Sequence, residues 1–397
     1  MQNNTDIRTS VAKLQQTRAK LKINAVQYLP FISAQGEYNY QKSSHNIGYT
    51  DNSRYYITGF DANWEIDLWG KGRQQTKSDE AAQKAMEYTL KNVQAVVAAE
   101  IALQYVYLVA TKEQLRLAGE NVKLQQQLFQ NVQDQYDSGL TDELSYQQAK
   151  YLLENTKSKI PSLKNDIEQY YNALSVLTGE YPENLLLNVP LKSPLMQYAN
   201  MVSLEMLAKL PADIIRKRPD VAAAEQNLIG QNAQVGVAVA NMYPSVNISA
   251  LWGFAAKNGG QLFGSDSHTY SYAPLVRLPL LDWYKLQNNV RLQKYIRDEY
   301  VEQYKASILK AVSELRNSIV QVSQNVKANK NHYKALQASK KMVSATLDKY
   351  NNGLTDFSEV LTNEQRYLEA QDSYILSKIA VLQSVIAYYK AAGGGYL

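Results

Sequence analysis

The chain has 397 residues, of which 45% are hydrophobic, and its formal net charge of +5 is spread along the sequence rather than gathered in the basic run of a nucleic-acid-binding tail. It contains no cysteine, which excludes disulfide bonds, thiol catalysis and Cys-ligated zinc, and its three histidines lack the spacing of a helical metal site. No stretch approaches the roughly 18 apolar residues of a membrane-spanning helix, so we expect none.

Residues 4–29 have the spacing of an amphipathic helix, for which Asn4, Thr5 or Asp6 can serve as the cap and Pro30 as the end. Two strands are predicted next, at 31–40 and 55–68, because polar and apolar side chains then alternate with a period of two. The polar residues 41–54 between them are expected to form an exposed loop.

No proline interrupts residues 71–137, which predicts one helix of roughly 100 Å at about 1.5 Å per residue. Ser138-Gly139 turns the chain, and residues 142–178 return as a helix with a kink at Pro161. Uncapped helices of this length are typical of coiled coils. The shorter helices can lie end to end along the long one, which gives a hairpin rod with its turn at Gly139.

This pattern occurs twice. Gln-Tyr-Asp-Ser-Gly-Leu-Thr-Asp at 135–142 returns as Lys-Tyr-Asn-Asn-Gly-Leu-Thr-Asp at 349–356, an offset of 214 positions that also relates Trp69 to Trp283. Solenoid repeats recur every 20–50 residues, so this offset indicates a duplicated domain. The expected divisions are a first repeat at 1–178, a connector or equatorial segment at 179–218, and a second repeat at 219–397.

Residues 179–219 hold five of the ten prolines. We interpret 179–200 as a connector and 201–210 as a short helix. Residues 195–218 have no counterpart before the first copy, and neither a secretion signal nor a lipid-accepting cysteine opens the chain. We therefore expect an N-terminal piece of the protein to be missing from this sequence.

The residue pattern of the predicted strands favours a location in a membrane. In the second copy, the side chains on one face are Val246, Ile248, Ala250, Trp252 and Phe254, whereas the fourth strand, 271–282, alternates less cleanly. All four tryptophans lie in or at the ends of strands, as in the aromatic girdles of an outer-membrane barrel. Four strands cannot close a barrel, for which about eight are the minimum, and an open edge is not viable in lipid. The barrel segments, 31–68 and 245–282, must then be shared within an oligomer.

Four segments carry a family resemblance. They are 64–70 (Trp-Glu-Ile-Asp-Leu-Trp-Gly), 210–221 (Leu-Pro-Ala-Asp-Ile-Ile-Arg-Lys-Arg-Pro-Asp-Val), 241–245 (Asn-Met-Tyr-Pro-Ser) and 393–395 (Gly-Gly-Gly). Together they resemble the TolC-like outer-membrane efflux proteins of resistance-nodulation-division pumps. The resemblance implies an α+β, mainly α fold: a homotrimer with four strands per chain in a shared 12-stranded outer-membrane barrel, continued by an antiparallel coiled-coil helical barrel.

The resemblance also implies a function. It predicts a passive exit duct, in the outer membrane of a Gram-negative bacterium and extending into the periplasm, that carries drugs or other toxic compounds outward. The expected partners are a periplasmic adaptor (membrane fusion) protein, an inner-membrane transporter and outer-membrane lipid, with no nucleic acid. Neither a P-loop nor a dinucleotide-binding glycine pattern is present, so we expect no catalytic residues, no metal and no cofactor.

Three sets of residues follow from the resemblance. The periplasmic gate is expected at Asp356, Glu359, Asp142 and Glu143. Adaptor contacts at the tips are expected at Ser138, Gly139, Leu140, Asn352, Gly353 and Leu354. The membrane-interface aromatics are expected to be Tyr38, Tyr40, Tyr56, Trp64, Trp69, Trp252 and Trp283.

The gate departs from the family pattern, because Thr362 stands where an aspartate is usual and Glu364 lies nearby. From the residues alone, Asp142 and Asp356 fit equally well as helix caps. Two other functions compete with the duct. One is a soluble coiled-coil scaffold or adaptor whose sheets pack together, and the other is a hydrolase that uses Glu65 and Asp67 as paired carboxylates.

Overall fold

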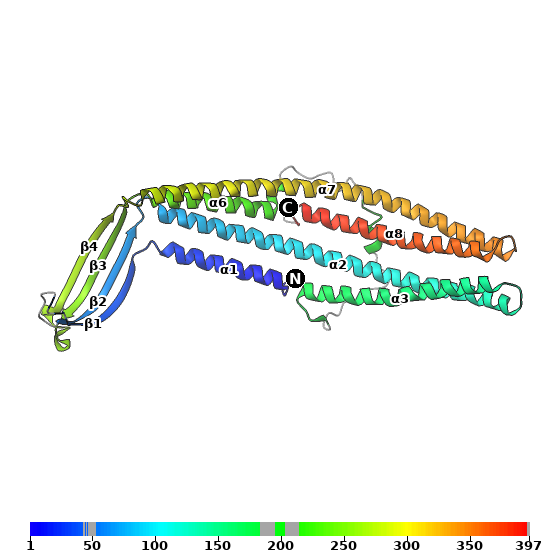
Figure 1. The fold of residues 1–397 in the computed structure, drawn as a ribbon, viewed down its shortest axis with the longest axis horizontal. Coiled ribbons are helices and arrows are strands. Elements are labelled where there is room, and N and C mark those ends of the chain that lie inside the picture. Colours follow the sequence, from blue (N-terminus) through cyan, green and yellow to red (C-terminus); the bar gives the residue numbers. More distant parts are fainter. Residues whose placement is uncertain (43, 45, 47–52, 183–194, 203–213, 395–397) are drawn as a thin grey trace. The chain divides into compact units, whose positions relative to one another are not determined.

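The computed structural model describes residues 1–42, 44, 46, 53–182, 195–202 and 214–394 (Figure 1). The first copy contains α1 (Thr5–Val26), β1 (Phe31–Gln41), β2 (Ser53–Ile66), α2 (Lys71–Asp137) and α3 (Glu143–Thr178). The second contains α6 (Pro219–Ala240), β3 (Ser245–Ala256), β4 (His268–Arg277), α7 (Trp283–Asn351) and α8 (Phe357–Ala391), with short α4 (Leu195–Tyr198) and α5 (Ile214–Lys217) before it. The expected mainly helical fold with four strands is confirmed.

The chain forms two compact units. The helical unit comprises Met1–Val11, Thr89–Val221 and Ser307–Leu397, and the sheet unit comprises Ala12–Tyr88 and Ala222–Ala306. Each unit draws on both copies, because the long helices α2 and α7 pass from one unit into the other. The boundaries at 1–178, 179–218 and 219–397 follow the duplication instead, and they stay a prediction.

In the sheet unit the four strands form one antiparallel sheet in the order β1-β2-β3-β4. Ala34 lies opposite Phe60, Phe60 opposite Trp252 and Trp252 opposite Tyr270. Because directly opposed residues share a face, these pairs form an apolar row across the whole sheet. Phe60, Trp252 and Tyr270 are 54%, 54% and 77% exposed, so the described residues leave this part of the face uncovered.

The opposite face of the sheet is polar. The hydroxyl of Ser33 donates to Asp61 at 2.6 Å, and the hydroxyl of Ser249 donates to Asn63 at 2.8 Å. Gly59 and Gly253 face each other on this side, and a Cβ on either would collide with the backbone of the other strand. Glycine at both positions therefore lets β2 and β3 approach closely.

The fourth strand differs from its prediction. It spans His268–Arg277 rather than 271–282, so Pro279 lies outside it while Pro274 lies within it. β4 is an edge strand of the sheet in this chain, where a residue without an N–H is tolerated. Two short 3₁₀ turns, η4 (Gly259–Gln261) and η5 (Ser265–Ser267), occupy the connection before it.

Four sequence expectations fall partly outside the described residues. They are the loop 41–54 at residues 43, 45 and 47–52, the connector 179–200 at 183–194, the short helix 201–210 at 203–210, and the motif segments 210–221 and 393–395 at 210–213 and 395.

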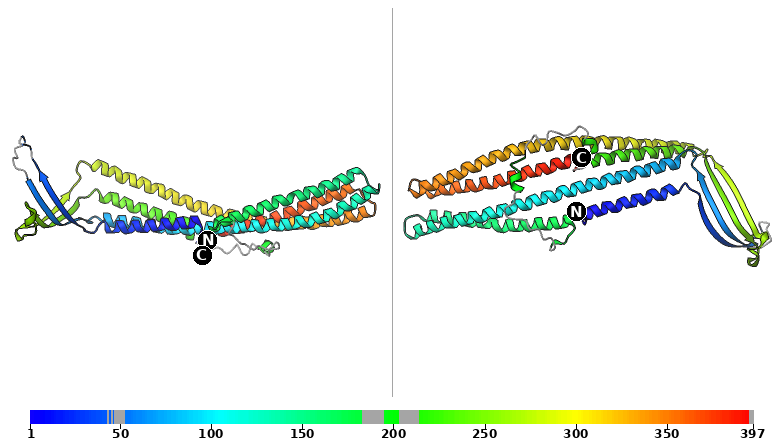
Figure 2. Two further views of the ribbon diagram at one scale, coloured as in Figure 1. Left: turned by 90° about the horizontal axis from the view of Figure 1, so that it is seen from below. Right: turned by 180° about the vertical axis from the view of Figure 1, so that it is seen from behind.

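In the helical unit, α3 lies alongside α2 and α8 alongside α7 (Figures 1 and 2). The core is formed by buried apolar side chains of these helices, among them Leu108, Val109, Leu174, Val322 and Val381. α3 continues through Pro161 without a break in its assigned helix, and the kink stays a prediction.

The expectation that no stretch is apolar enough to span a membrane is wrong for α2 by composition. One 18-residue window of this helix has a mean hydropathy of 1.6, and 33% of the window is buried within the chain. Val106, Leu108 and Val109 of α2 pack in the core of the helical unit. Coiled-coil packing thus accounts for part of this apolar content.

In each copy, the residue just before the first helix donates a hydrogen bond to the last turn of the returning helix. We call this contact a joint. In the first joint, Asn4 Nδ2 donates to the carbonyl of Leu177 at 2.8 Å. In the second joint, Arg218 Nη1 donates to the carbonyl of Ala391 at 3.0 Å. The two donors and the two acceptors are both related by the repeat offset of 214 positions. Asn4 Oδ1 also accepts the N–H groups of Asp6 and Ile7, so Asn4 is the cap of α1.

Arg218 carries additional contacts. Its guanidinium binds Asp220 through two hydrogen bonds of 3.0 and 2.7 Å, and Nη2 also donates to Glu314 at 2.6 Å. Its side chain is 7% exposed. Burial alone would raise the pKa of Asp220, but the hydrogen bonds and charge of Arg218 outweigh it and hold that pKa below its usual value. The second joint is therefore an ion-pair network in which a buried guanidinium meets two partly exposed carboxylates.

Candidate functional site

Within the helical unit, the α2–α3 turn and the α7–α8 turn lie at the same end (Figures 1 and 2). A cavity of 560 Å³ is lined from both turns, by Leu140 and Asp142 of the first and Gly353 and Asp356 of the second. The structure thus brings residues that lie 214 positions apart around one space. Glu143 and Glu359, which belong to the same predicted gate, are not among the residues that line it.

The two turns have the same backbone geometry. Gly139 and Gly353 have φ values of +69° and +71°, in the left-handed region that favours glycine. The N–H of Leu140 donates to the carbonyl of Gln135 at 2.8 Å, and the N–H of Leu354 donates to that of Lys349 at 2.9 Å. With the glycine N–H bonded to Tyr136 in one turn and Tyr350 in the other, both at 2.9 Å, each is a Schellman motif.

The side chains that flank these glycines also correspond. Ser138 Oγ and Asn352 Nδ2 each donate to the backbone carbonyl four residues earlier, at 2.7 Å. Leu140 and Leu354 follow the glycines and are 78% and 75% exposed. Each tip therefore presents one apolar side chain to its surroundings on a rigid turn.

The acidic residues of the two tips differ in their partners. Asp142 Oδ1 accepts the N–H of Ser145 at 2.9 Å, which caps α3. Hydrogen bonding from Ser145 lowers the pKa of the Asp142 carboxyl. Asp356 occupies the equivalent position of α8, but its side chain makes no cap hydrogen bond. The capping alternative thus holds for Asp142 only, and a gate role for Asp356 stays a prediction.

The two glutamates bond to neighbouring side chains. Glu143 accepts a hydrogen bond from Gln147 Nε2 at 2.7 Å, and the hydrogen bonds of Gln147 and Tyr136 lower its pKa. Glu359 accepts the hydroxyl of Thr355. Both carboxylates stay at the surface of their tips, and their role in a gate stays a prediction.

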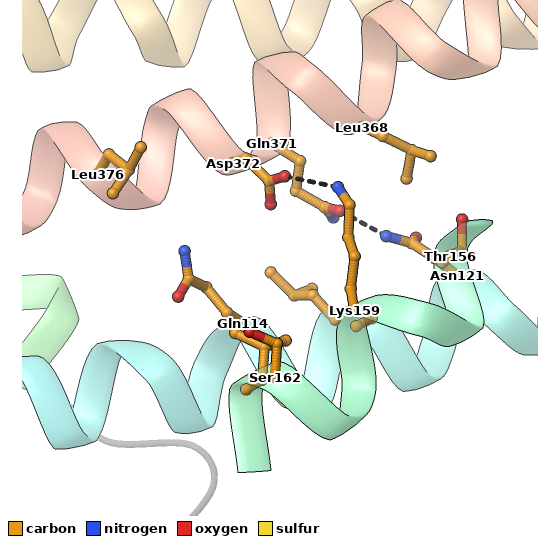
Figure 3. Close-up of a pocket in the computed structure, with 12 residues that line it drawn as sticks. Gln114, Asn121, Thr156, Lys159, Ser162, Leu368, Gln371, Asp372 and Leu376 are labelled. Carbon is orange, nitrogen blue, oxygen red and sulfur yellow. Dashed lines mark hydrogen bonds and ion pairs between the residues drawn. The ribbon is translucent and has the colours of Figure 1, made fainter. Parts of the chain in front are cut away.

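A second cavity in the helical unit, of 260 Å³, lies among α2, α3 and α8 (Figure 3). Lys159 of α3 reaches across to Asp372 of α8 at 3.0 Å, and Asn121 of α2 donates to Gln371 of α8 at 2.7 Å. These contacts tie the hairpin of the first copy to the hairpin of the second. Sequence analysis missed them, because the partners are more than 200 positions apart and no local pattern links them.

In the sheet unit the predicted interface aromatics fall into groups. Tyr38 and Tyr56 face each other at the strand ends next to the β1–β2 loop, with ring centroids 4.7 Å apart, and Tyr40 lies two residues further along β1. Trp252 lies opposite Phe60, near the middle of the strands, and so does not sit at either end.

The remaining tryptophans lie at the other end of the strands. They are Trp64, Trp69 and Trp283. Trp69 stacks on Tyr243 with ring centroids 4.8 Å apart, and its Nε1 donates to the carbonyl of Pro244 at 2.7 Å. Both ends of the sheet thus carry exposed aromatic rings, as an interfacial girdle requires.

In the part of the chain that the structure describes, no group of three or more His, Asp or Glu side chains is placed to hold a metal ion.

A sequence profile described as "Outer membrane efflux protein" matches residues 1–180 and 210–394. The chain is 25% identical over 400 residues to the cation efflux system protein CusC of Escherichia coli (strain K12), covering 99% of this chain and 84% of the relative. It is 27% identical over 407 residues to the probable efflux pump outer membrane protein TtgC of Pseudomonas putida, covering 99% of this chain and 81% of the relative.

Solved structures are similar over the whole chain. The outer-membrane channel OprN matches with a TM-score of 0.90 and 26% identity, over 100% of this chain and 88% of the other. The CmeC outer membrane channel of Campylobacter jejuni matches in fold, with a TM-score of 0.89 and 23% identity over 99% of this chain and 84% of the other.

Proposed function

The chain belongs to the outer membrane efflux protein family, and we propose that it is the passive exit duct of a tripartite efflux system. Its relatives are named as outer membrane proteins of efflux pumps, which supports this role and the outer membrane of a Gram-negative bacterium, with extension into the periplasm, as its location. The named cargoes of the relatives range from cations to toluene and antibiotics. We therefore assign this duct to small toxic compounds as a class.

The apolar face of the sheet carries this proposal. In a soluble protein such a face packs on a core, whereas here Phe60, Trp252 and Tyr270 are about half or more exposed. β1 and β4 are both edge strands, and an edge is not viable in lipid. Three copies that pair β1 of one with β4 of the next close a 12-stranded barrel with the apolar face outward.

The experiment that tests this assembly is the mass of the detergent-solubilised protein, measured by light scattering with correction for bound detergent. A trimer of about three times 44.9 kDa is expected. A monomer or dimer that stays soluble without detergent would overturn the duct and support the coiled-coil scaffold instead.

We propose that Leu140 and Leu354 contact the periplasmic adaptor, which in turn links the duct to an inner-membrane transporter. Both are exposed apolar side chains on rigid glycine turns at the same end of the helical unit (Figure 1), where the resemblance to TolC-like proteins predicts the adaptor contact. Replacement of both by serine is expected to abolish efflux in cells that contain the whole pump while leaving trimer assembly intact. Leu309→Ser is the control, because Leu309 is 70% exposed on α7 but lies far in sequence from either turn. Equal efflux by the two variants would remove the leucines from the adaptor contact.

We infer that the chain catalyses no reaction. The paired carboxylates Glu65 and Asp67 have structural partners: Glu65 forms an ion pair with Lys71 at 3.3 Å, and Asp67 accepts the N–H groups of Gly72 and Arg73 at 3.0 and 3.1 Å. Asp67 therefore caps α2, and this structural role accounts for its presence here without a catalytic function.

A further inference from the structure

A third cavity of the helical unit lies between α2, α7 and α8, and it has a volume of 460 Å³. That volume is within the range of about 300–1,000 Å³ that small-molecule sites occupy. Its apolar lining comes from Leu124 and Leu128 of α2 and from Val343 and Leu347 of α7. We call this cavity the three-helix groove.

Gln125 lines the three-helix groove and is 4% exposed. Both polar atoms of its side chain, Nε2 and Oε1, are buried without a hydrogen-bond partner, and no other described side chain has such an atom. An unpaired buried amide destabilises the folded chain, so its presence calls for a group that is not part of the chain. The groove is therefore bordered by a buried amide whose donor and acceptor are both unused.

Glu364 of α8 also lines the groove. Sequence analysis placed it near the gate, but it lies half-buried among α2, α7 and α8, and burial raises the pKa of its carboxyl. Among the described residues, no Lys or Arg lies within ion-pair distance of it. Lys340, at the α7 side, is exposed and stays unpaired with it.

We propose that the three-helix groove binds a small organic cation, with its ammonium group on Glu364, its polar middle on Gln125 and its apolar body on the leucines. Charge complementarity supports this occupant, because a half-buried carboxylate without a cation is stabilised by one. A protonated amine can donate to Glu364 and to Gln125 Oε1, while an acceptor on the same molecule can take the hydrogen from Nε2.

Monodansylcadaverine is a suitable probe, since it joins a primary ammonium and a sulfonamide to an apolar aromatic body. Its fluorescence is titrated against the full chain in detergent, with a protein-free micelle blank subtracted. Saturable binding is expected for the wild type. N-Pentyl dansylamide, which keeps the five-carbon chain but lacks the ammonium, is expected to bind at least tenfold more weakly, since a charge-assisted hydrogen bond is lost.

Matched variants locate the site. Glu364→Gln is expected to weaken binding about tenfold or more, because it removes the charged contact. Gln125→Leu is expected to weaken binding by a similar factor, because it removes the two neutral contacts of the amide. Lys340→Gln is expected to strengthen binding, because it removes a like charge from the rim. Glu369→Gln is the control, as Glu369 lies on the same helix but does not line the groove.

Unsaturable binding by the wild type, or equal binding by Glu364→Gln and Glu369→Gln, would overturn the site. Equal binding of N-pentyl dansylamide would also overturn the site, since binding would then not depend on contact between the ammonium and Glu364. The duct itself is tested separately, by the mass of the assembly in detergent. A trimer that binds no cation refutes the groove alone, and a monomer that binds one refutes the duct alone.

Discussion

The joint of the first copy is neutral, whereas the joint of the second copy is charged. Asn4 and Arg218 hold equivalent carbonyls, 2.8 and 3.0 Å away, yet only Arg218 brings two carboxylates with it. The duplication has thus kept the geometry of the contact while the chemistry changed. Because both carbonyls lie in the last turn of the returning helix, each joint holds the end of α3 or α8 against the start of its copy.

The tips show the same kind of divergence. Both turns share a Schellman motif and an exposed leucine, but Asp142 caps its helix and Asp356 does not. Backbone geometry is therefore common to the two copies, and the partners of the charged side chains are what differ. Asp142 has a capping role, whereas Asp356 has none. We therefore expect the carboxylate of Asp356 to be available for a function that Asp142 does not share.

The largest effect is expected from breaking the second joint. Arg218→Met leaves Asp220 and Glu314 without their cation. Because these two side chains are 32% and 42% exposed and keep part of their hydration, the cost should stay below the about 3–5 kcal/mol of a fully buried pair. Thermal unfolding of the solubilised protein should show a large drop in Tm. The triple variant in which both carboxylates are also made neutral amides should recover part of it. No recovery would mean that Arg218 acts by packing alone.

The second joint should also respond to pH. The pKa of Asp220 is lowered in the folded protein, so its contribution is present above the unfolded pKa of about 3.9 and is lost as pH falls through the folded value. Stability measured below about pH 4 should therefore fall in the wild type. In Arg218→Met this part of the pH dependence of stability should disappear. An unchanged pH dependence would mean that other carboxylates cause it.

The first joint should break at a smaller cost. Asn4→Ala removes the cap of α1 and the hydrogen bond to Leu177, and the loss of a cap costs about 0.5–2 kcal/mol. The drop in Tm should be clearly less than for Arg218→Met. Asn4→Asp keeps the cap acceptor but loses the donor, so it should fall between Asn4→Ala and the wild type. Equal losses for Asn4→Ala and Arg218→Met would refute the contrast between the joints.

The elements of the fold could be predicted from the sequence because their signals are local. The helix over 71–137 needed only an unbroken run without proline, and the residues of β1 alternate with a period of two. β4 was misplaced because its alternation is weak and a proline lies on each side of its true end. Prolines at 274 and 279 look alike in the sequence, and only the register with β3 separates them.

The candidate sites were predictable only in part, for a different reason. Gly139 and Gly353 could be predicted because the turn needs a residue with positive φ, and a single glycine in the sequence indicates such a position. Whether Asp142 caps a helix or faces a cation depends on the rotation of one side chain, which no pattern encodes. The pair Lys159 and Asp372, and the unpaired amide of Gln125, arise only when distant helices pack.

The smallest effect, and the sharpest test of the comparison, separates the two tip aspartates. Asp142→Ala should lower Tm, because α3 loses its cap, while Asp356→Ala should leave Tm unchanged, since that side chain makes no cap bond.

Block of single-channel current by a divalent cation should depend on the other aspartate, Asp356. Asp356→Ala, and its combination with Glu359→Ala, should raise the half-blocking concentration roughly two- to fivefold, the factor that an exposed charge interaction supplies. Asp142→Ala should change block less, because the charge it removes already lies at a capped helix start. If both aspartates altered block equally, the gate would be a property of the whole tip, and the difference in capping between the copies would have no bearing on conduction.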